Sequence, residues 1–170
     1  LCYDGTVLYF IDGYGMNRLV RIDPIHLSSI DTLKVDFPGS IDGLATNGKF
    51  VYALDYTRHV VYEVDVASKT ILRTLNFNLS IGGGMTYAAN RHSFFIGNFN
   101  YIIYEVDAID GHLIDSISTT IRPYGVGYSC TGNVLFVGDY GSQTQVLNPN
   151  TGEIISSFSI GYDGLASDES

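Results

Sequence analysis

The sequence predicts an all-β fold, a β-propeller of four four-stranded repeats of about 42 residues each. Three observations predict it. An aromatic, β-branched segment that ends in Asp or Asn recurs four times, and a second segment with the same polar ending follows each copy. A glycine-containing segment precedes three of the copies and recurs near the end of the chain. No sustained 3.6-residue apolar period occurs, so no helix is expected.

The first recurring segment predicts a strand followed by a turn. Its copies lie at residues 7–12, 50–55, 93–98 and 134–139, and they end at Asp12, Asp55, Asn98 and Asp139, in steps of 43, 43 and 41 residues. Aromatic and β-branched residues favour strands, and Asp or Asn favours turns. A ring of calcium ligands is the alternative for these four residues. We expect a structural role, because a residue that recurs in every repeat usually builds the repeat.

Comparison of the four repeats also predicts the remaining strands of each blade. Copies of the second segment lie at residues 21–23, 63–65, 105–107 and 146–148, and polar alternating stretches such as 71–75 and 154–158 come after them. These stretches predict an outermost strand. The glycine-containing segment predicts the innermost strand, because its Gly43, Gly84, Gly125 and Gly164 suit the crowding around a central axis.

The ends of the chain bear on how the ring closes. Residues 1–170 are expected to form a single domain, with repeats at about 1–37, 38–78, 79–120 and 121–160. Residues 161–170 then hold a spare innermost strand around Gly164, which we expect to complete the first blade and close the ring. Two alternatives remain: the strand completes a blade of the next chain in a fibre, or the four blades belong to a larger ring.

One repeat resembles known propeller families. Residues 123–126, the strand ending at Asp139-Tyr140-Gly141-Ser142, and Leu147-Asn148-Pro149-Asn150-Thr151-Gly152-Glu153 are similar to a YVTN-type blade. The whole chain resembles the YVTN, NHL and YWTD propellers. That resemblance implies the fold, an extracellular or periplasmic location, and protein or glycan partners. Some related propellers are lactonases or lyases, and typical members have six or seven blades.

Charge narrows the classes of partner. The chain has nine basic and 18 acidic residues, a net charge of −9. Nucleic acids and anionic membrane surfaces are therefore disfavoured, because both need clustered Lys and Arg. No apolar run approaches the length of about 18 residues that a membrane span requires.

The candidate binding residues gather on one predicted face of the disc. An aromatic residue comes shortly after the Asp or Asn that ends each copy of the first segment. These residues are Tyr14, Tyr56, Phe99 and Tyr140. Neighbouring loops supply Arg58, Tyr101, Arg122, Tyr124 and Tyr162. A tyrosine-rich face with a few charges suits a protein or glycan, because tyrosine offers apolar area and a hydroxyl together. The alternative is that these rings pack between blades.

Catalytic patterns are scarce. The histidines His26, His59, His92 and His112 have no metal-binding spacing, and no nucleophile motif occurs. We therefore expect no enzymatic activity, no cofactor and no metal. Cys2 and Cys130 could form a disulfide if the first and fourth blades are neighbours. Asn78 begins a glycosylation sequon, which matters only in a secreted eukaryotic protein.

The sequence therefore favours an extracellular or cell-surface binding module. Two alternatives stay open: a filament or surface-layer subunit that self-associates through the spare strand, and a metal-dependent propeller hydrolase or lyase.

Overall fold

The structure is a computed structural model that describes residues 1–12 and 18–160. These residues form four antiparallel sheets of four strands each. The first sheet contains β1 (Cys2–Tyr3), β2 (Leu8–Asp12), β3 (Arg18–Asp23) and β4 (Ser28–Leu33). The second contains β5 (Ile41–Thr46), β6 (Val51–Asp55), β7 (Val60–Asp65) and β8 (Thr70–Asn76). The third contains β9 (Met85–Ala88), β10 (Ser93–Asn98), β11 (Ile102–Asp107) and β12 (Leu113–Ser118). The fourth contains β13 (Gly125–Ser129), β14 (Val134–Gly138), β15 (Thr144–Leu147) and β16 (Ile154–Phe158).

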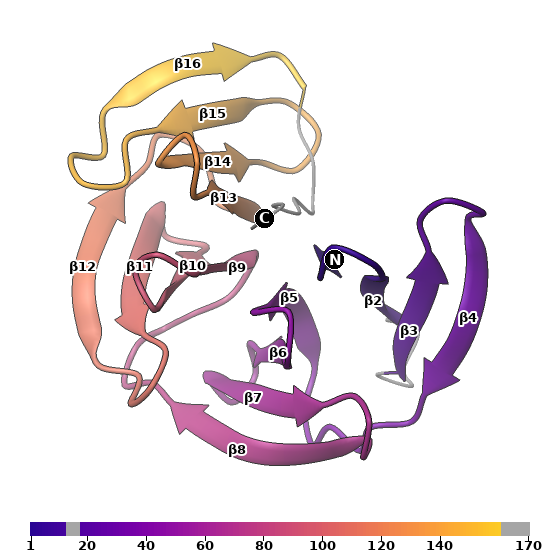
Figure 1. The fold of residues 1–170 in the computed structure, drawn as a ribbon. Coiled ribbons are helices and arrows are strands. Elements are labelled where there is room, and N and C mark those ends of the chain that lie inside the picture. Colours follow the sequence, from indigo (N-terminus) through magenta and orange to yellow (C-terminus); the bar gives the residue numbers. More distant parts are fainter. Residues whose placement is uncertain (13–17, 161–170) are drawn as a thin grey trace.

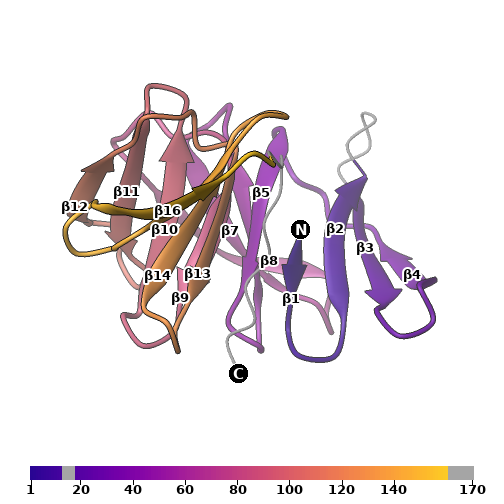
Figure 2. The ribbon, with the colours of Figure 1, turned by 90° about the horizontal axis from the view of Figure 1, so that it is seen from above.

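Each sheet is a meander whose strands pair in chain order. The innermost strands β1, β5, β9 and β13 surround a central axis, and β4, β8, β12 and β16 form the rim (Figure 1). Seen from the edge, the inner strands run from one face of the disc to the other (Figure 2). The predicted four-bladed, all-β propeller is confirmed. We call the face that carries the β10–β11, β12–β13 and β14–β15 loops the site face.

Glycine is required where blades crowd together. A Cβ on Gly84 would lie 2.4 Å from the backbone nitrogen of Val126, and a Cβ on Gly97 would lie 2.3 Å from the carbonyl oxygen of Pro123. Neither neighbour can move away, because each belongs to the backbone of the next blade. The close approach of the third and fourth blades therefore depends on the absence of these side chains.

Apolar side chains fill the space between consecutive blades. Tyr9, Tyr52 and Phe95 hold the same position in β2, β6 and β10, and their exposed fractions are 5%, 4% and 0%. Tyr9 packs with Leu44 of the second blade, and the ring centroid of Phe95 lies 5.5 Å from that of Tyr128 in the fourth. Each blade thus buries one face against the blade that follows it.

The first and fourth blades stand on either side of an opening in the ring (Figure 1). The first blade has a short innermost strand, because β1 pairs only Cys2 with Tyr9 and Tyr3 with Leu8. In the second blade, β5 extends this pairing as far as Asp55. The end of β2, from Phe10 to Asp12, therefore has no innermost partner among the described residues. The predicted closing strand, residues 161–170, lies outside the described residues.

The outer faces of the two end blades are more exposed than the matching interior faces. Leu33, Leu75 and Ile117 occupy one register position in three successive blades, and all are buried. Phe158 holds that position in the fourth blade, and it is 52% exposed. Across the opening, Phe10 is only partly buried, whereas its counterpart Ala53 is fully buried. The two end faces correspond to the two halves of an interblade contact.

The disulfide considered from the sequence is not formed, and both cysteines are free thiols. Cys2 is buried in the cluster between the first and second blades, where burial raises the pKa of its thiol to about 12. Cys130 directly follows β13, with its Sγ 3.7 Å from Asn90 Oδ1 of the third blade. Each cysteine therefore faces the blade next to its own, and neither faces the opening between the first and fourth blades.

Candidate binding site

Asp55, Asn98 and Asp139 organise the turns that follow them, as predicted, whereas the turn after Asp12 lies outside the described residues. Asp55 Oδ1 accepts hydrogen bonds from the backbone nitrogens of Thr57 and Arg58, at 3.0 and 3.2 Å. Asp139 Oδ1 accepts bonds from Ser142 N and Gln143 N, at 3.0 and 2.6 Å. These carboxylates hold the loops on the site face in shape, and the aromatic residue that follows each of them is thereby directed outward.

Three aromatic rings from three loops meet on this face. The centroid of Tyr124 lies 5.3 Å from that of Phe99 and 6.0 Å from that of Tyr140. Phe99 follows β10, Tyr124 precedes β13, and Tyr140 follows β14. Phe99 and Tyr140 remain 39% and 73% exposed. The rings therefore form a surface, rather than packing wholly between blades.

Buried Pro123 positions two of the site residues. Its carbonyl oxygen accepts a hydrogen bond from Gly84 N at 3.4 Å, and it approaches Gly97 closely because Gly97 has no side chain. Proline also fixes its own φ. Arg122 and Tyr124, on either side of Pro123, are thus held on a short segment that is anchored to the third blade.

Arg122 stacks on a tyrosine. Its guanidinium carbon lies 5.6 Å from the ring centroid of Tyr101, within the range of a cation–π interaction. The hydroxyls of Tyr101 and Tyr124 beside it raise the pKa of the guanidinium, so Arg122 is a cation throughout the working pH range. A hydrogen bond from Thr119 N to Tyr101 O, at 2.8 Å, ties the two loops together.

These residues enclose an open pocket with a volume of about 350 Å³. Its walls combine aromatic rings, hydroxyls, one cation and one carboxylate, and are formed by Tyr101, Thr120, Ile121, Arg122, Tyr124, Asp139 and Tyr140. We call Phe99, Tyr101, Arg122, Tyr124 and Tyr140 the aromatic–arginine cluster. Such a surface can stack against a ring, donate hydrogen bonds to an anion and exchange hydrogen bonds with hydroxyls.

Five of the nine predicted binding residues lie close together in the structure, and these five form the aromatic–arginine cluster. Tyr56 is 40% exposed, and no ring contact links it to the cluster. Arg58 instead approaches Asp55 of its own turn, with Nη1 3.5 Å from Oδ2. Tyr14 and Tyr162 lie outside the described residues. Asn78 is exposed in the loop between β8 and β9, where its side chain is accessible.

Sequence reasoning missed two pocket residues, Thr120 and Ile121. Both lie in the connection between the third and fourth blades, where the repeats differ in sequence and offer no matching position. Their position directly before Arg122 is the only signal that could have pointed to them. Asp139 was expected to build a turn, and it also lines the pocket.

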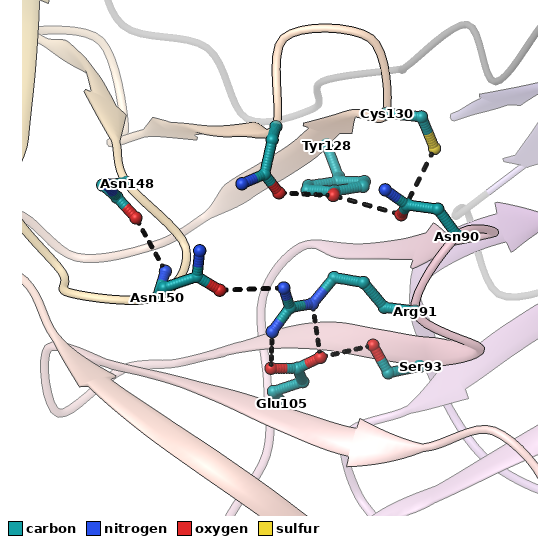
Figure 3. A network of polar contacts seen from close by, with 9 residues as sticks. Asn90, Arg91, Ser93, Glu105, Tyr128, Cys130, Asn148 and Asn150 are labelled. Carbon is teal, nitrogen blue, oxygen red and sulfur yellow. Dashed lines mark hydrogen bonds and ion pairs between the residues drawn. The ribbon is translucent and has the colours of Figure 1, made fainter.

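A second polar cluster lies on the opposite face and joins the third and fourth blades (Figure 3). Arg91 binds both carboxylate oxygens of Glu105 at 2.8 Å, and Ser93 donates to Glu105 at 2.7 Å. Arg91 also donates to Asn150 Oδ1 of the fourth blade at 2.9 Å. Nearby, the hydroxyl of Tyr128 lies 3.1 Å from Asn90 Oδ1. Because Glu105 is paired and nearly fully buried, we assign this network to interblade packing.

One group of potential metal ligands is present in the described residues. The ligand atoms of Asp107, Asp110 and His112 all lie within 4.8 Å of one another on the β11–β12 turn, on the face opposite the cluster. Asp107 accepts hydrogen bonds from its own turn, and Asp110 lies 2.7 Å from His112 Nδ1. The hydrogen bonds within the turn therefore explain why these three side chains lie close together without a metal ion.

Solved structures share the fold. The chain is similar to the glutaminyl cyclase of Myxococcus xanthus, with a TM-score of 0.77 and 14% identity over 94% of this chain and 69% of that one. It is also similar to the β-propeller domain of Cps50 (Swd1) from Myceliophteria thermophila, with a TM-score of 0.60 and 16% identity over 95% and 57% of the two chains. A chain of the mitotic checkpoint complex gives a TM-score of 0.62 and 16% identity over 93% and 51%.

The fold is a β-propeller. At these identities the likeness shows the fold alone, and this propeller spans about half the length of the Cps50 and checkpoint chains. No known family model matches the sequence, and no curated protein matches it. Membership of the YVTN, NHL or YWTD families therefore stays a resemblance. No helix in the described residues is long and apolar enough to cross a bilayer.

Proposed function

We propose that this propeller is a non-enzymatic binding module, acting outside the cell or at its surface, that holds a protein or glycan through the aromatic–arginine cluster. The observation that carries the proposal is the convergence of Tyr101, Arg122, Tyr124 and Tyr140 on one pocket from three loops. Exposed aromatic rings beside an arginine are the residue types that dominate binding energy at recognition surfaces.

The solved neighbours are compatible with this role but do not single it out. One belongs to a protein complex, and another is an enzyme, the glutaminyl cyclase. The pocket lacks a described nucleophile–base pair, since Asp139 is engaged by its own turn. A binding role uses the side chains that the pocket does contain.

A glycan array and a pull-down with the intact chain test the proposal. Removing two rings of the cluster with Tyr124→Ala and Tyr140→Ala should weaken binding of whatever partner is found by about tenfold or more. Tyr56→Ala is the matched control, because Tyr56 is an exposed tyrosine outside the cluster. A partner that tolerates the double substitution, or loses affinity equally with Tyr56→Ala, contradicts the assignment of the site.

The exposed end faces favour a second candidate function, a self-associating structural subunit. Phe158 of one copy would pack on the Leu8 and Phe10 side of the next copy, because these faces repeat the two halves of the interior contacts. Phe158→Asp should then lower the solution mass of the assembly, whereas Leu72→Asp, an equally exposed position on β8, should not. A monomeric mass for the unmodified chain contradicts self-association. If removal of residues 161–170 leaves an assembly intact, strand exchange is not its mechanism.

A further inference from the structure

We propose that the pocket of the aromatic–arginine cluster binds a saccharide that carries a carboxylate, and that Arg122 pairs with this carboxylate. The inference rests on the proposed binding function of the same pocket and specifies its ligand.

No carboxylate of the described residues forms an ion pair with Arg122. Arg21, Arg58, Arg73 and Arg91 all pair with a carboxylate of the chain. Arg122 forms no ion pair with a described residue, although the chain has twice as many acidic as basic residues.

The carboxylate that lines the same pocket is already used. Asp139 accepts hydrogen bonds from the backbone nitrogens of Ser142 and Gln143 and from the Ser142 hydroxyl. The Ser142 hydrogen bond is the main cause of the lowered pKa of this carboxyl group. Asp139 therefore shapes the loop and leaves Arg122 available.

The stacking on Tyr101 orients the guanidinium. A guanidinium over a ring face keeps its N–H groups at the edge of its plane, where two of them can meet the two oxygens of a carboxylate. Tyr101 thus reduces the conformational freedom that Arg122 would lose on binding. Because the net charge of −9 repels an anionic ligand in general, its binding would depend on this local contact with Arg122.

The other walls favour a saccharide over an acidic peptide. Tyr140, 73% exposed, offers a ring face against which the C–H face of a sugar can stack. The hydroxyls of Tyr101, Tyr124 and Thr120 can exchange hydrogen bonds with sugar hydroxyls. The pocket volume of about 350 Å³ suits one or two sugar rings.

Calorimetric titration of the intact chain with two pairs of ligands tests the inference. The pairs are trigalacturonate with its methyl ester, and 3′-sialyllactose with lactose. At least one acidic member should bind about tenfold or more tightly than its neutral counterpart. Arg122→Gln should remove this preference, because it should weaken binding of the acidic member far more than binding of its neutral counterpart.

Two further variants separate charge from geometry. Lys34→Gln removes one positive charge from an exposed residue elsewhere on the site face, so it should leave the preference intact. Arg122→Lys keeps the charge without the fork of N–H groups, so it should retain only part of the preference. The melting temperature of each variant should stay close to that of the unmodified chain, because Arg122 is exposed and its stacking on Tyr101 is a surface contact.

Several results would overturn the inference: equal affinities within both pairs, no binding of any of the four ligands, or a preference that survives Arg122→Gln. Tighter binding of a glutamate hexapeptide than of both acidic saccharides would also overturn it. If a neutral saccharide or a protein binds and is lost with Tyr124→Ala and Tyr140→Ala, the proposed binding function stands and only the carboxylate inference fails.

Discussion

Arg91 and Glu105 form a two-point ion pair, with Nε–Oε1 and Nη2–Oε2 distances both of 2.8 Å. Glu105 is 2% exposed, and the same guanidinium reaches Asn150 in the fourth blade. The Arg91–Asn150 hydrogen bond therefore links the blade that carries Tyr101 to the blade that carries Tyr140. The polar network on one face of the disc thus supports the arrangement of the binding loops on the other.

Replacing Arg91 with methionine should strongly destabilise the fold. The substitution leaves a buried carboxylate without its partner, which costs about 3 kcal/mol or more. The comparable Arg21–Asp31 pair is more exposed, with side chains 29% and 37% accessible, so Arg21→Met should cost under about 1 kcal/mol. Unfolding in urea measures both. Equal losses for the two variants would show that the buried Arg91–Glu105 pair contributes no more than a surface pair.

Gly84→Ala should destabilise the contact between the third and fourth blades. Its Cβ would meet the backbone of Val126 at 2.4 Å, and relieving that overlap requires a backbone shift that costs about 1–3 kcal/mol. Gly132→Ala is the control, because the nearest atom to its Cβ lies at an ordinary 3.4 Å. Denaturant midpoints distinguish them. A neutral Gly84→Ala would mean that the innermost strands approach less closely than described.

Phe158→Ala should cost less than about 1 kcal/mol, whereas Ile117→Ala at the matching position should cost about 2–5 kcal/mol. The reason is burial, since Phe158 is 52% exposed and Ile117 is 5% exposed. Thermal unfolding of dilute protein measures the difference. A large loss for Phe158→Ala would show that another segment or another copy covers this side chain.

Stability should fall in acid partly through Asp55. Burial raises the pKa of this carboxyl group, but hydrogen bonds from Thr57, Tyr62 and the backbone of Arg58 outweigh burial and lower the pKa. A group whose pKa is lower in the folded state contributes stability that is present above its unfolded pKa of about 3.9 and is lost as the pH falls through its folded value. Unfolding free energies measured from pH 7 to pH 2 should therefore decline below about pH 4. The Asp55→Asn variant should decline less steeply, and identical slopes would remove Asp55 from this account.

The sequence was sufficient to predict the fold because the repeats carry the same strand and turn pattern. Gly84 and Asp55 fall at their predicted positions because every blade imposes the same crowding and the same turn. For the cluster, the sequence predicted the face of the disc but not which residues meet there. Phe99, Tyr140 and Tyr56 hold equivalent positions in their blades, yet Tyr56 does not join the cluster. Which loops meet depends on the anchoring of Pro123 against Gly97, and no single repeat contains both residues. Thr120, Ile121 and the Arg91–Asn150 bond have no repeat-wide pattern that would reveal them.

The most direct test of the central claim, that the aromatic–arginine cluster is the binding surface, follows the ring NMR signals of the tyrosines during a titration with the tightest-binding ligand found for the intact chain. Tyr101, Tyr124 and Tyr140 should shift together with one saturating dependence on ligand, and Tyr56 should not shift. Unchanged signals from Tyr124 and Tyr140, or saturating shifts confined to tyrosines outside the cluster, would contradict the account.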